Sequence, residues 1–375
     1  MESLNHSIIL RYPPKASVIY LHFVHDLFRN KKFFQICQKI GKRFVILSDK
    51  NVASLYKASL IESMEKQGFS PFFITIEVGE RQKNRKTKEQ IEDKMLMEAY
   101  GRDSCLIAMG GGVVMDLAGF VAATYCRGIP YLTIPTSLLG MVDASIGGKT
   151  GVNVKYGKNL IGALYPPCSI FIDPSMLNTL PDKEMRDGIV EIIKYGLIFH
   201  RRLFYDIVDN LDKWQCRDLN FIKKIIIKSS IIKKKIIEVD FEDIGMRRIL
   251  NFGHTIGHAI EMLEAYRISH GEALAMGIMV ESFISQKMGG LQHSDCNVIY
   301  HLIKTLGFSL SLSKKVRVCG MFNAMKIDKK SQCNHPRFVL LDGIGKSCSF
   351  EGEYCTRIDT SMLRDALEWM VKEFS

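Results

Sequence analysis

The sequence predicts an α/β domain with a largely parallel sheet, followed by a mainly α-helical domain. From about residue 43, short runs rich in β-branched and aromatic residues alternate with helical stretches. Such alternation is typical of βα units, in which helices cover the faces of a parallel sheet. After the segment "DPSMLNTLPDKE", apolar residues recur at helical spacing with few strand signals. We therefore expect a domain boundary near residue 175, separating 1–175 from 176–375.

The predicted elements follow one another in a regular order. In the first domain they are strand 43–49, helix 51–68, strand 71–78, helix 86–101, strand 104–110, helix 112–125, and strands 131–136 and 169–173. In the second domain helical patterns cover 184–200, 221–239, 254–266 and 272–289. Thr179, shortly before Pro181 and Asp182, is a candidate helix start.

The composition favours a globular protein that binds small anions. Lys and Arg (51) exceed Asp and Glu (40) by 11, and 47% of residues are apolar. The positive charge is spread along the chain without a basic tail or a nucleic-acid-binding motif, which argues against nucleic acid as a partner. The ten cysteines are scattered without a C-x-x-C pair, as expected of free thiols in a reducing compartment. The N-terminal residues show no signal peptide, so we expect a cytoplasmic protein.

One apolar segment, 105–126, is long enough to cross a bilayer. It contains three consecutive glycines and a central Asp116, which disfavour a membrane helix. We expect a buried strand, a glycine turn and a buried helix there, and no membrane partner.

The same segment contains "MGGGVVMD" (109–116) between the strand and the helix. Glycines at this place let the backbone approach a ligand, and the helix N-terminus favours a phosphate group. The pattern is not the G-x-G-x-x-G fingerprint of dinucleotide-binding proteins. A phosphate site and a simple tight turn both remain open.

Residues 135–167 read as a long polar loop rich in Gly, Lys, Asn, Ser and Thr. Long loops in compact domains are more often functional than idle. Lys149 and Lys158 could pair with phosphate, and Thr136, Ser137 and Asn159 could bind hydroxyl groups. Solvent-exposed lysines are the simpler alternative.

A metal site is indicated by His254, His258 and His270, three histidines close in sequence among glycines. His254 and His258, at i and i+4, share a helical face as two zinc ligands do in H-E-x-x-H, although the general-base Glu of that motif is missing. Spacing alone favours this pair plus a more distant group, with His270 in a loop that could fold back. Glu191 and Lys194 also share a helical face, as an ion pair or as a ligand beside a functional lysine.

Read in order, several segments resemble the 3-dehydroquinate synthase family. They are "GGGVVMDLAGFVAATYCRG" (110–128), "IPTSLLGMVDASIGGKTGVNVKYGKNLIGALYPP" (134–167), "EIIKYG" (191–196), "RRILNFGHTIGHAIE" (247–261), "HGEALAMG" (270–277) and "DKK" (328–330). The resemblance runs from about residue 45 to 345. It implies one divalent ion, Zn2+ or Co2+, held by Glu191, His254 and His270. His258 then contacts the substrate instead of the metal.

The resemblance also implies NAD+ as cofactor. The matching cofactor positions are Asp49, Asn51, Glu80, Lys83, Gly111, Gly112, Val113, Asp116, Thr136, Ser137, Asp143, Lys149, Lys158 and Thr179. The implied catalytic residues are Lys149, His258, Lys194, Asn159 and Lys158, and the implied substrate-binding residues are Arg127, Asp143, Lys233, Arg247, Asn251 and Lys329. Lys330 is an alternative to Lys329, and the run Lys233–Lys235 leaves the register of Lys233 open.

The implied reaction converts 3-deoxy-D-arabino-heptulosonate 7-phosphate, a phosphorylated sugar acid, to 3-dehydroquinate and phosphate in the shikimate pathway. The family resemblance suggests a homodimer. Two alternatives are another sugar-phosphate cyclase and a metal-dependent polyol dehydrogenase of the glycerol dehydrogenase type.

Overall fold

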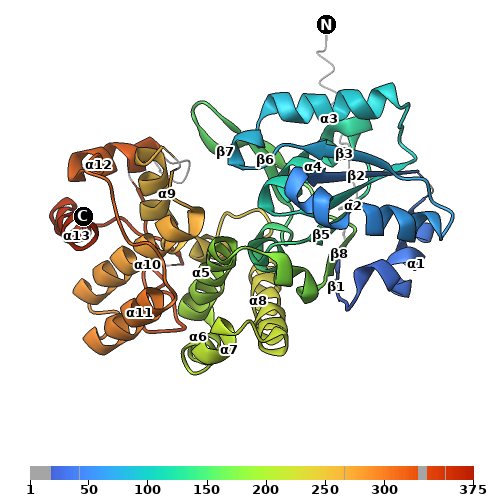
Figure 1. The fold of residues 1–375 in the computed structure, drawn as a ribbon. Helices are drawn as coiled ribbons and strands as arrows, with labels where there is room; N and C mark the ends of the chain where they lie inside the picture. Colours follow the sequence, from blue (N-terminus) through green and yellow to red (C-terminus); the bar gives the residue numbers. More distant parts are fainter. Residues whose placement is uncertain (1–17, 42, 266, 328–335, 351) are drawn as a thin grey trace, which may run out of the picture.

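The computed structural model describes residues 18–41, 43–265, 267–327, 336–350 and 352–375. The strands and helices of the sheet-forming half are β1 (Tyr20–Phe23), α1 (Lys31–Ile40), β2 (Arg43–Asp49), α2 (Lys50–Glu65), β3 (Phe72–Ile76), α3 (Arg85–Met97), β4 (Ser104–Gly110), α4 (Gly112–Thr124), β5 (Tyr131–Pro135), β6 (Lys149–Val154), β7 (Gly157–Leu164) and β8 (Ser169–Ile172). The helices that follow are α5 (Asp182–Phe199), α6 (Arg201–Val208), α7 (Leu211–Gln215), α8 (Leu219–Val239), α9 (His254–Leu263), α10 (His270–Lys287), α11 (His293–Thr305), α12 (Val318–Ile327) and α13 (Thr360–Phe374). The sheet and the helical half lie side by side (Figure 1).

The main sheet confirms the predicted α/β class. Its strand order is β1-β8-β5-β4-β2-β3, and every neighbouring pair is parallel. Successive residues of β2 alternate between two apolar layers, because side chains along a strand point to opposite faces. Phe44 belongs to the layer that includes Leu60 of α2, whereas Val45 belongs to the layer that includes Ile91 of α3. Helices therefore cover both faces of the sheet.

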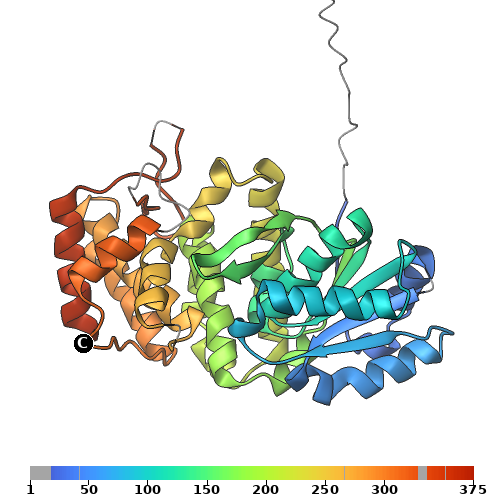
Figure 2. The same cartoon turned by 90° about the horizontal axis from the view of Figure 1, so that it is seen from above.

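The structure contains elements that the sequence analysis did not predict. Strand β1 extends the sheet at its edge by pairing in parallel with β8, and α1 follows it. The expected loop 135–167 also contains an antiparallel hairpin, in which Thr150 pairs with Ala163. The loop prediction was therefore wrong for β6 and β7: its many glycines and polar residues concealed a strand pair. The hairpin stands between the two halves of the molecule in both views (Figures 1 and 2).

The apolar segment 105–126 forms β4 and α4, as predicted. Among the described residues, no helix is long and apolar enough to cross a membrane. Thr179 ends a short 3-10 helix (Pro174–Thr179), and α5 begins only at Asp182, so Thr179 is not its cap. The domain boundary near residue 175 stays a prediction.

Two glycines bring α9 and α10 into close contact in the helical half. A Cβ atom added at Gly277 of α10 would lie 2.0 Å from the carbonyl oxygen of Gly253, which precedes α9. Gly253 itself has a φ of 78°, a value that favours glycine. The first residue of each helix is a histidine, and this close packing holds His254 and His270 near each other.

Candidate functional site

A crevice lies where the order of the parallel strands reverses. Strand β3 pairs with one side of β2, whereas β4, the next strand in the chain, pairs with the other side of β2. In open parallel sheets, ligands bind at such a switch point, beyond the carboxyl ends of the strands. Asp49 ends β2 there and caps α2 by accepting a hydrogen bond from the Val52 backbone N–H (3.0 Å). Gly111 follows β4 at the same edge.

The crevice is suited to a ligand with phosphate groups. It has a volume of about 740 Å³. Helix α4 begins at Gly112 without a side-chain cap, so its first N–H groups are available to an anion. A Cβ atom at Gly111 would lie 3.3 Å from Ser137 Oγ, so a larger residue at position 111 would crowd Ser137 in the wall of the crevice. The predicted cofactor residues that line the crevice are Asp49, Asn51, Glu80, Gly111, Gly112, Val113, Thr136, Ser137, Lys158 and Thr179.

Lys83 and Asp116 form a buried ion pair beside this crevice. Burial by itself favours the neutral amine of Lys83, but Asp116 and Glu80 outweigh that effect and raise the pKa of Lys83. The Lys83 side chain thus contacts Asp116 and does not line the crevice. Its predicted role in binding the cofactor stays a prediction.

A second cluster unites three helices. Glu191 lies in the middle of α5, His254 begins α9 and His270 begins α10. One ligand atom from each of the three lies within 4.8 Å of the others. Glu191 Oε1 is 3.4 Å from His254 Nε2 and 3.3 Å from His270 Nε2. A carboxylate oxygen and two imidazole nitrogens at these distances form a donor set suited to Zn2+ or a similar ion.

The other ring nitrogen of each histidine has a hydrogen-bond acceptor nearby. His254 Nδ1 is 3.1 Å from the Phe252 carbonyl oxygen, so Nδ1 carries the proton that this oxygen accepts. His270 Nδ1 is 3.4 Å from Glu261 Oε1. Both contacts leave Nε2 as the nitrogen that faces Glu191. In many metal sites the histidine ring is oriented in this way, by a hydrogen bond from the ring nitrogen that does not bind the ion. The three residues therefore fit a divalent ion.

His258 lies one turn after His254 on α9 but is not part of this cluster. The rings of His254 and His258 meet edge to face, with centroids 5.4 Å apart. The i, i+4 spacing thus identified neighbours without identifying the partners of His254. Those partners are distant in sequence, and Glu191 and His270 are 79 residues apart.

Glu191 also forms a buried ion pair with Lys194 on the same helix. Each side chain is only 2% exposed. Burial alone would raise the pKa of Glu191, but Lys194 and the two histidines hold it well below its usual value. These three partners therefore favour the ionised form of Glu191. Burial lowers the pKa of His270, but Glu191 and Glu261 more than offset this and raise it to about 10.

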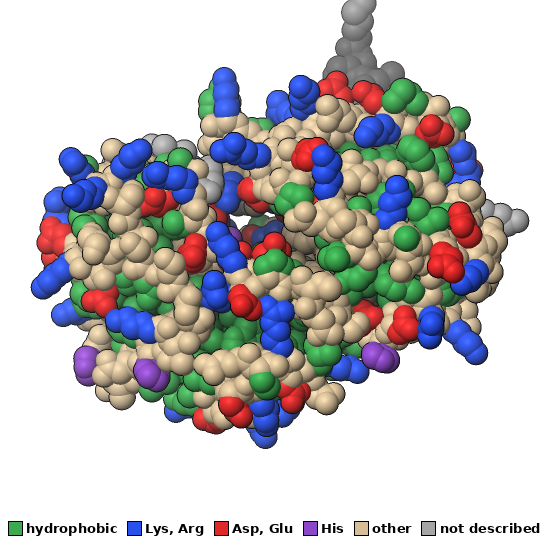
Figure 3. Space-filling model, viewed as in Figure 1, with side chains coloured by type: hydrophobic (Ala, Val, Ile, Leu, Met, Phe, Trp, Pro, Cys, Tyr) green, Lys and Arg blue, Asp and Glu red, His purple; other side chains and the backbone are tan. Residues whose placement is uncertain are grey.

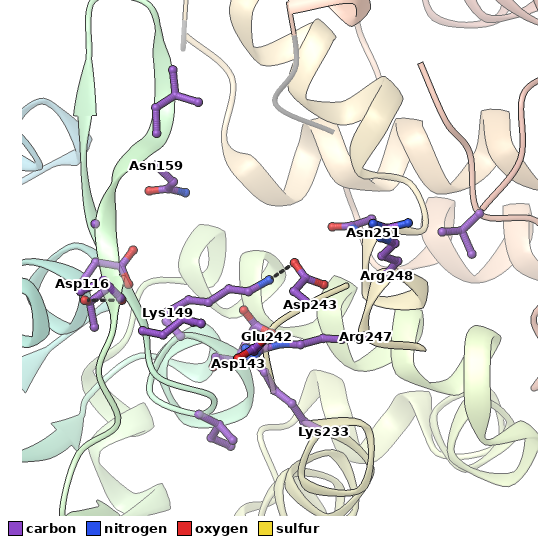
Figure 4. Close-up of a pocket in the computed structure, with 18 of the residues that line it drawn as sticks. Asp116, Asp143, Lys149, Asn159, Lys233, Glu242, Asp243, Arg247, Arg248 and Asn251 are labelled. Carbon is purple, nitrogen blue, oxygen red and sulfur yellow. Dashed lines mark hydrogen bonds and ion pairs between the residues drawn. The ribbon is translucent and has the colours of Figure 1, made fainter. Parts of the chain in front are cut away.

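A second pocket, of about 630 Å³, adjoins the hairpin and helix α8. The predicted site residues that line it are Asp116, Asp143, Lys149, Asn159, Lys233, Arg247 and Asn251. Figure 4 shows these residues, which come from α4, the short helix Gly140–Ala144, the hairpin, α8 and the segment before α9. Three of these side chains are cationic, which suits an anionic substrate.

The structure resolves the register of the lysine run on α8. Lys233 is buried, and its Nζ lies 2.6 Å from both the carbonyl oxygen and Oδ1 of Asp143. Lys234 is exposed and pairs with Glu238. Burial would raise the pKa of Asp143, but Lys233 outweighs it and lowers that pKa. Lys233 is thus the lysine of this run that faces the pocket.

Two acidic residues of the site were not predicted from the sequence. Asp243 forms an ion pair with Lys149 (Figure 4). Its φ of 66° lies in the left-handed region, and no sequence pattern indicated that geometry. Glu261 contacts both His270 Nδ1 and Lys158 Nζ. A signal for Glu261 was present, because positions 254, 258 and 261 share one face of a helix.

One predicted substrate residue lies elsewhere, and another is not among the described residues. Arg127 is exposed and ends a 3-10 helix just before β5, at the amino edge of the sheet. The crevice lies at the carboxyl edge, roughly 15 Å away along a strand of this length. Lys329 and its alternative Lys330 lie outside the described residues.

A hollow opens between the two halves of the molecule (Figure 3). Lys and Arg side chains surround it, and acidic and histidine side chains are visible inside. A switch-point crevice for phosphates, a Glu-His-His cluster and a cation-lined pocket thus adjoin one another. Together they define an α/β protein with a nucleotide-type crevice beside a candidate metal centre.

The comparisons with known proteins identify the family. The family model described as 3-dehydroquinate synthase N-terminal matches residues 73–187, and the one described as 3-dehydroquinate synthase C-terminal matches 188–331. The 3-dehydroquinate synthase of Rippkaea orientalis is 41% identical over 311 residues, covering 82% of this chain and 85% of that protein. The chain belongs to the 3-dehydroquinate synthase family.

Solved structures share the fold. The 2-epi-5-epi-valiolone synthase ValA from Streptomyces hygroscopicus subsp. jinggangensis 5008, with NAD+ and Zn2+ bound, has a TM-score of 0.88 at 24% identity, covering 98% of this chain and 100% of that chain. A 2-deoxy-scyllo-inosose synthase complexed with carbaglucose-6-phosphate, NAD+ and Co2+ has a TM-score of 0.78 at 24% identity, covering 92% and 95%.

Proposed function

We propose that the chain is a 3-dehydroquinate synthase, which converts 3-deoxy-D-arabino-heptulosonate 7-phosphate to 3-dehydroquinate and phosphate with NAD+ and one Zn2+ or Co2+ ion. The observation that carries the proposal is the position of His270. It belongs to the Glu-His-His cluster and also lines the switch-point crevice. A nucleotide in the crevice and an ion at the cluster would therefore be neighbours.

The residues of each site suit these two groups. The crevice offers the free N-terminus of α4 to a pyrophosphate, and Glu191, His254 and His270 offer three ligand atoms while leaving room for substrate oxygens. When bound, NAD+ supplies a hydride acceptor that later returns the hydride, and the divalent ion supplies a Lewis acid at the oxidised alcohol. The reaction has no net redox change.

The second pocket would hold the charged ends of the substrate. Lys149, Lys233 and Arg247 provide positive charge for a phosphate and a carboxylate. Arg247 is fixed by donating hydrogen bonds from Nη1 to the Phe241 carbonyl (2.6 Å) and from Nη2 to the Gly147 carbonyl (3.0 Å). Its orientation is thus set before any substrate binds. Asn159 and Asn251 add hydrogen-bond partners for hydroxyl groups.

Proton transfers fall to the side chains near the cluster. His258 lies beside His254, and Lys149 lies at the pocket wall. We assign to them the movement of protons between the sugar hydroxyls and the departing phosphate, whose own oxygens can also accept a proton. Lys194, ion-paired with Glu191, keeps the buried carboxylate charged. Full turnover by a His258→Ala enzyme would remove the histidine from this role.

One assay separates the proposal from its alternatives. The protein is incubated with NAD+, Zn2+ and the heptulosonate phosphate while phosphate and nicotinamide absorbance are followed together. Phosphate release without lasting NADH supports the proposal. Stoichiometric NADH would indicate a polyol dehydrogenase, and activity only on a heptulose 7-phosphate would indicate another cyclase. The pocket cations Lys233 and Arg247 favour the carboxylate-bearing substrate.

The proposal includes a homodimer in a reducing compartment such as the cytoplasm. The nine described cysteines are free thiols, which suits such a compartment. Arg127 lies at the edge of the sheet opposite the crevice, so it would contact substrate only in the site of a second copy. Mixing equal amounts of Arg127→Ala and His258→Ala subunits, each inactive alone, would then restore about a quarter of wild-type activity, since half of the dimers would carry one intact site. No restored activity would exclude this role for Arg127.

A further inference from the structure

Glu261 is a buried carboxylate at the junction of the crevice and the metal cluster. It lies on α9, is 2% exposed, and lines the crevice with His270 and Lys158. Its Oε1 atom is 3.4 Å from His270 Nδ1 and 3.0 Å from Lys158 Nζ. The proposed reaction assigns no role to this residue.

The two histidines of the cluster differ in the group that contacts Nδ1, the ring nitrogen that does not face Glu191. His254 Nδ1 faces the neutral carbonyl of Phe252, a residue of its own chain segment. His270 Nδ1 faces the Glu261 carboxylate, which belongs to a different helix. A carboxylate behind a histidine fixes the tautomer and ring orientation and makes the facing nitrogen a stronger donor to a metal. The ring of His270 therefore depends on Glu261 in a way that the ring of His254 does not.

We propose that Glu261 is a positioning residue for the metal centre: its carboxylate holds the His270 ring with Nε2 toward Glu191. The inference rests on the proposed function, because it assumes that the cluster binds an ion. Glu261 itself is not among the proposed ligands, because the three side chains whose ligand atoms lie within 4.8 Å of one another are Glu191, His254 and His270.

Lys158 provides a second comparison. Its amine contacts the same oxygen, Oε1, that faces His270 Nδ1. Lys158 therefore competes with His270 for the charge on this oxygen. Removing the amine does not disturb the contact between Oε1 and His270 Nδ1, so Lys158→Met should not weaken metal binding, although it removes a residue of the proposed catalytic set.

Glu264 provides a matched control on the same helix turn. It is also buried (3% exposed), but its Oε1 accepts a hydrogen bond from the Ser313 backbone N–H (2.7 Å) and its Oε2 faces Arg267 (3.4 Å). Glu264→Gln thus changes a buried carboxylate at the C-terminal end of α9 without touching His270. It reports the general effect of disturbing this helix.

The experiment measures Zn2+ affinity by chelator competition, and Co2+ binding by visible absorption, in the full-length wild type and each variant. We expect Glu261→Ala to lower Zn2+ affinity by about 10- to 100-fold, as is typical when such a supporting partner is lost. Glu261→Gln should lose less, because its amide oxygen still accepts from Nδ1–H. Glu264→Gln and Lys158→Met should retain wild-type affinity. Thermal unfolding of each metal-free variant checks that it is folded.

Two outcomes would overturn the inference. One is wild-type Zn2+ affinity in folded Glu261→Ala and Glu261→Gln proteins. The other is an equal loss in Glu264→Gln, which would show that any change in α9 weakens the site. A wild-type protein that binds no ion would instead refute the proposed function, and this inference with it.

Discussion

Replacing Lys194 by methionine in the metal-free protein removes the lysine partner of a carboxylate that is 2% exposed. Breaking a buried ion pair by removing one partner typically costs about 3 to 5 kcal/mol, because the remaining charge is left in a poorly solvated place. His270, whose pKa is raised to about 10, still carries a compensating proton near Glu191 at neutral pH. We therefore expect the lower end of that range, about 3 kcal/mol, for Lys194→Met.

Neutralising both partners should be far less harmful than neutralising one. In Glu191→Gln/Lys194→Met neither buried charge remains, so the double variant should be clearly more stable than Lys194→Met alone. Zn2+ should also recover much of the stability of Lys194→Met, because the ion brings positive charge to Glu191 and binds only the folded state. The double variant, which lacks a metal ligand, should gain much less from Zn2+.

Urea unfolding of the wild type, Glu191→Gln, Lys194→Met and the double variant with chelator gives the four free energies of the metal-free cycle. The same four proteins are then unfolded with Zn2+. If the two substitutions add within about 0.5 kcal/mol in the metal-free protein, the pair is not coupled as its burial implies. If Zn2+ stabilises the double variant as much as Lys194→Met, Glu191 is not a ligand.

Three further predictions concern the supports of the site. Asp240 accepts backbone hydrogen bonds from the turn that follows it, and although burial opposes this, these bonds lower its pKa. Its carboxylate should therefore contribute stability at pH 7 that is lost as the pH falls below its unfolded pKa of about 4 and through the folded value. Urea unfolding should show Asp240→Asn destabilised by about 1 to 3 kcal/mol at pH 7, and the difference from wild type should shrink as the pH is lowered. Gly277→Ala places a Cβ 2.0 Å from the Gly253 carbonyl oxygen, whereas a Cβ at Gly320 would have its nearest neighbour 3.5 Å away. Thermal unfolding should therefore show a loss of stability of about 3 kcal/mol for Gly277→Ala and none for Gly320→Ala. Asp49→Ala should lose about 1 kcal/mol of stability with the cap of α2, and Asp49→Ser should restore the stability without restoring NAD+ affinity in a fluorescence titration. Equal NAD+ affinity of the wild type and both variants would exclude a role of the Asp49 side chain in NAD+ binding.

Much of the sheet could be predicted from the sequence, because local pattern reports local structure. Strand β4, the glycine turn and α4 lie where the apolar run and the glycines placed them. The hairpin β6–β7 was missed because glycines and polar residues interrupt the apolar residues of its strands, so no clear alternation is left. They are held by contacts that sequence periodicity does not record, such as the hydrogen bond from the Asn153 backbone N–H to the Lys83 carbonyl (2.7 Å).

The edge strand β1 was missed for a related reason. It is only four residues long, too short for an alternation of apolar and polar residues to be clear. It forms a strand by pairing with β8, which is distant in sequence. Asp243 was missed because its place in the pocket depends on a left-handed backbone conformation in a turn. Neither feature leaves a periodic signal.

By itself the sequence determined the kinds of ligand atom and their helical frames: a glutamate on one helix and histidines at or near the starts of two others. The family resemblance implied that Glu191, His254 and His270 share an ion and that His258 does not bind it. The tertiary structure shows that the three side chains meet, that His258 lies outside their cluster, and that Glu261 contacts His270 Nδ1. The reason is that residue type and period are local properties. Convergence depends on how closely α5, α9 and α10 pack, and the Gly253 and Gly277 contact sets that distance for two of the three helices.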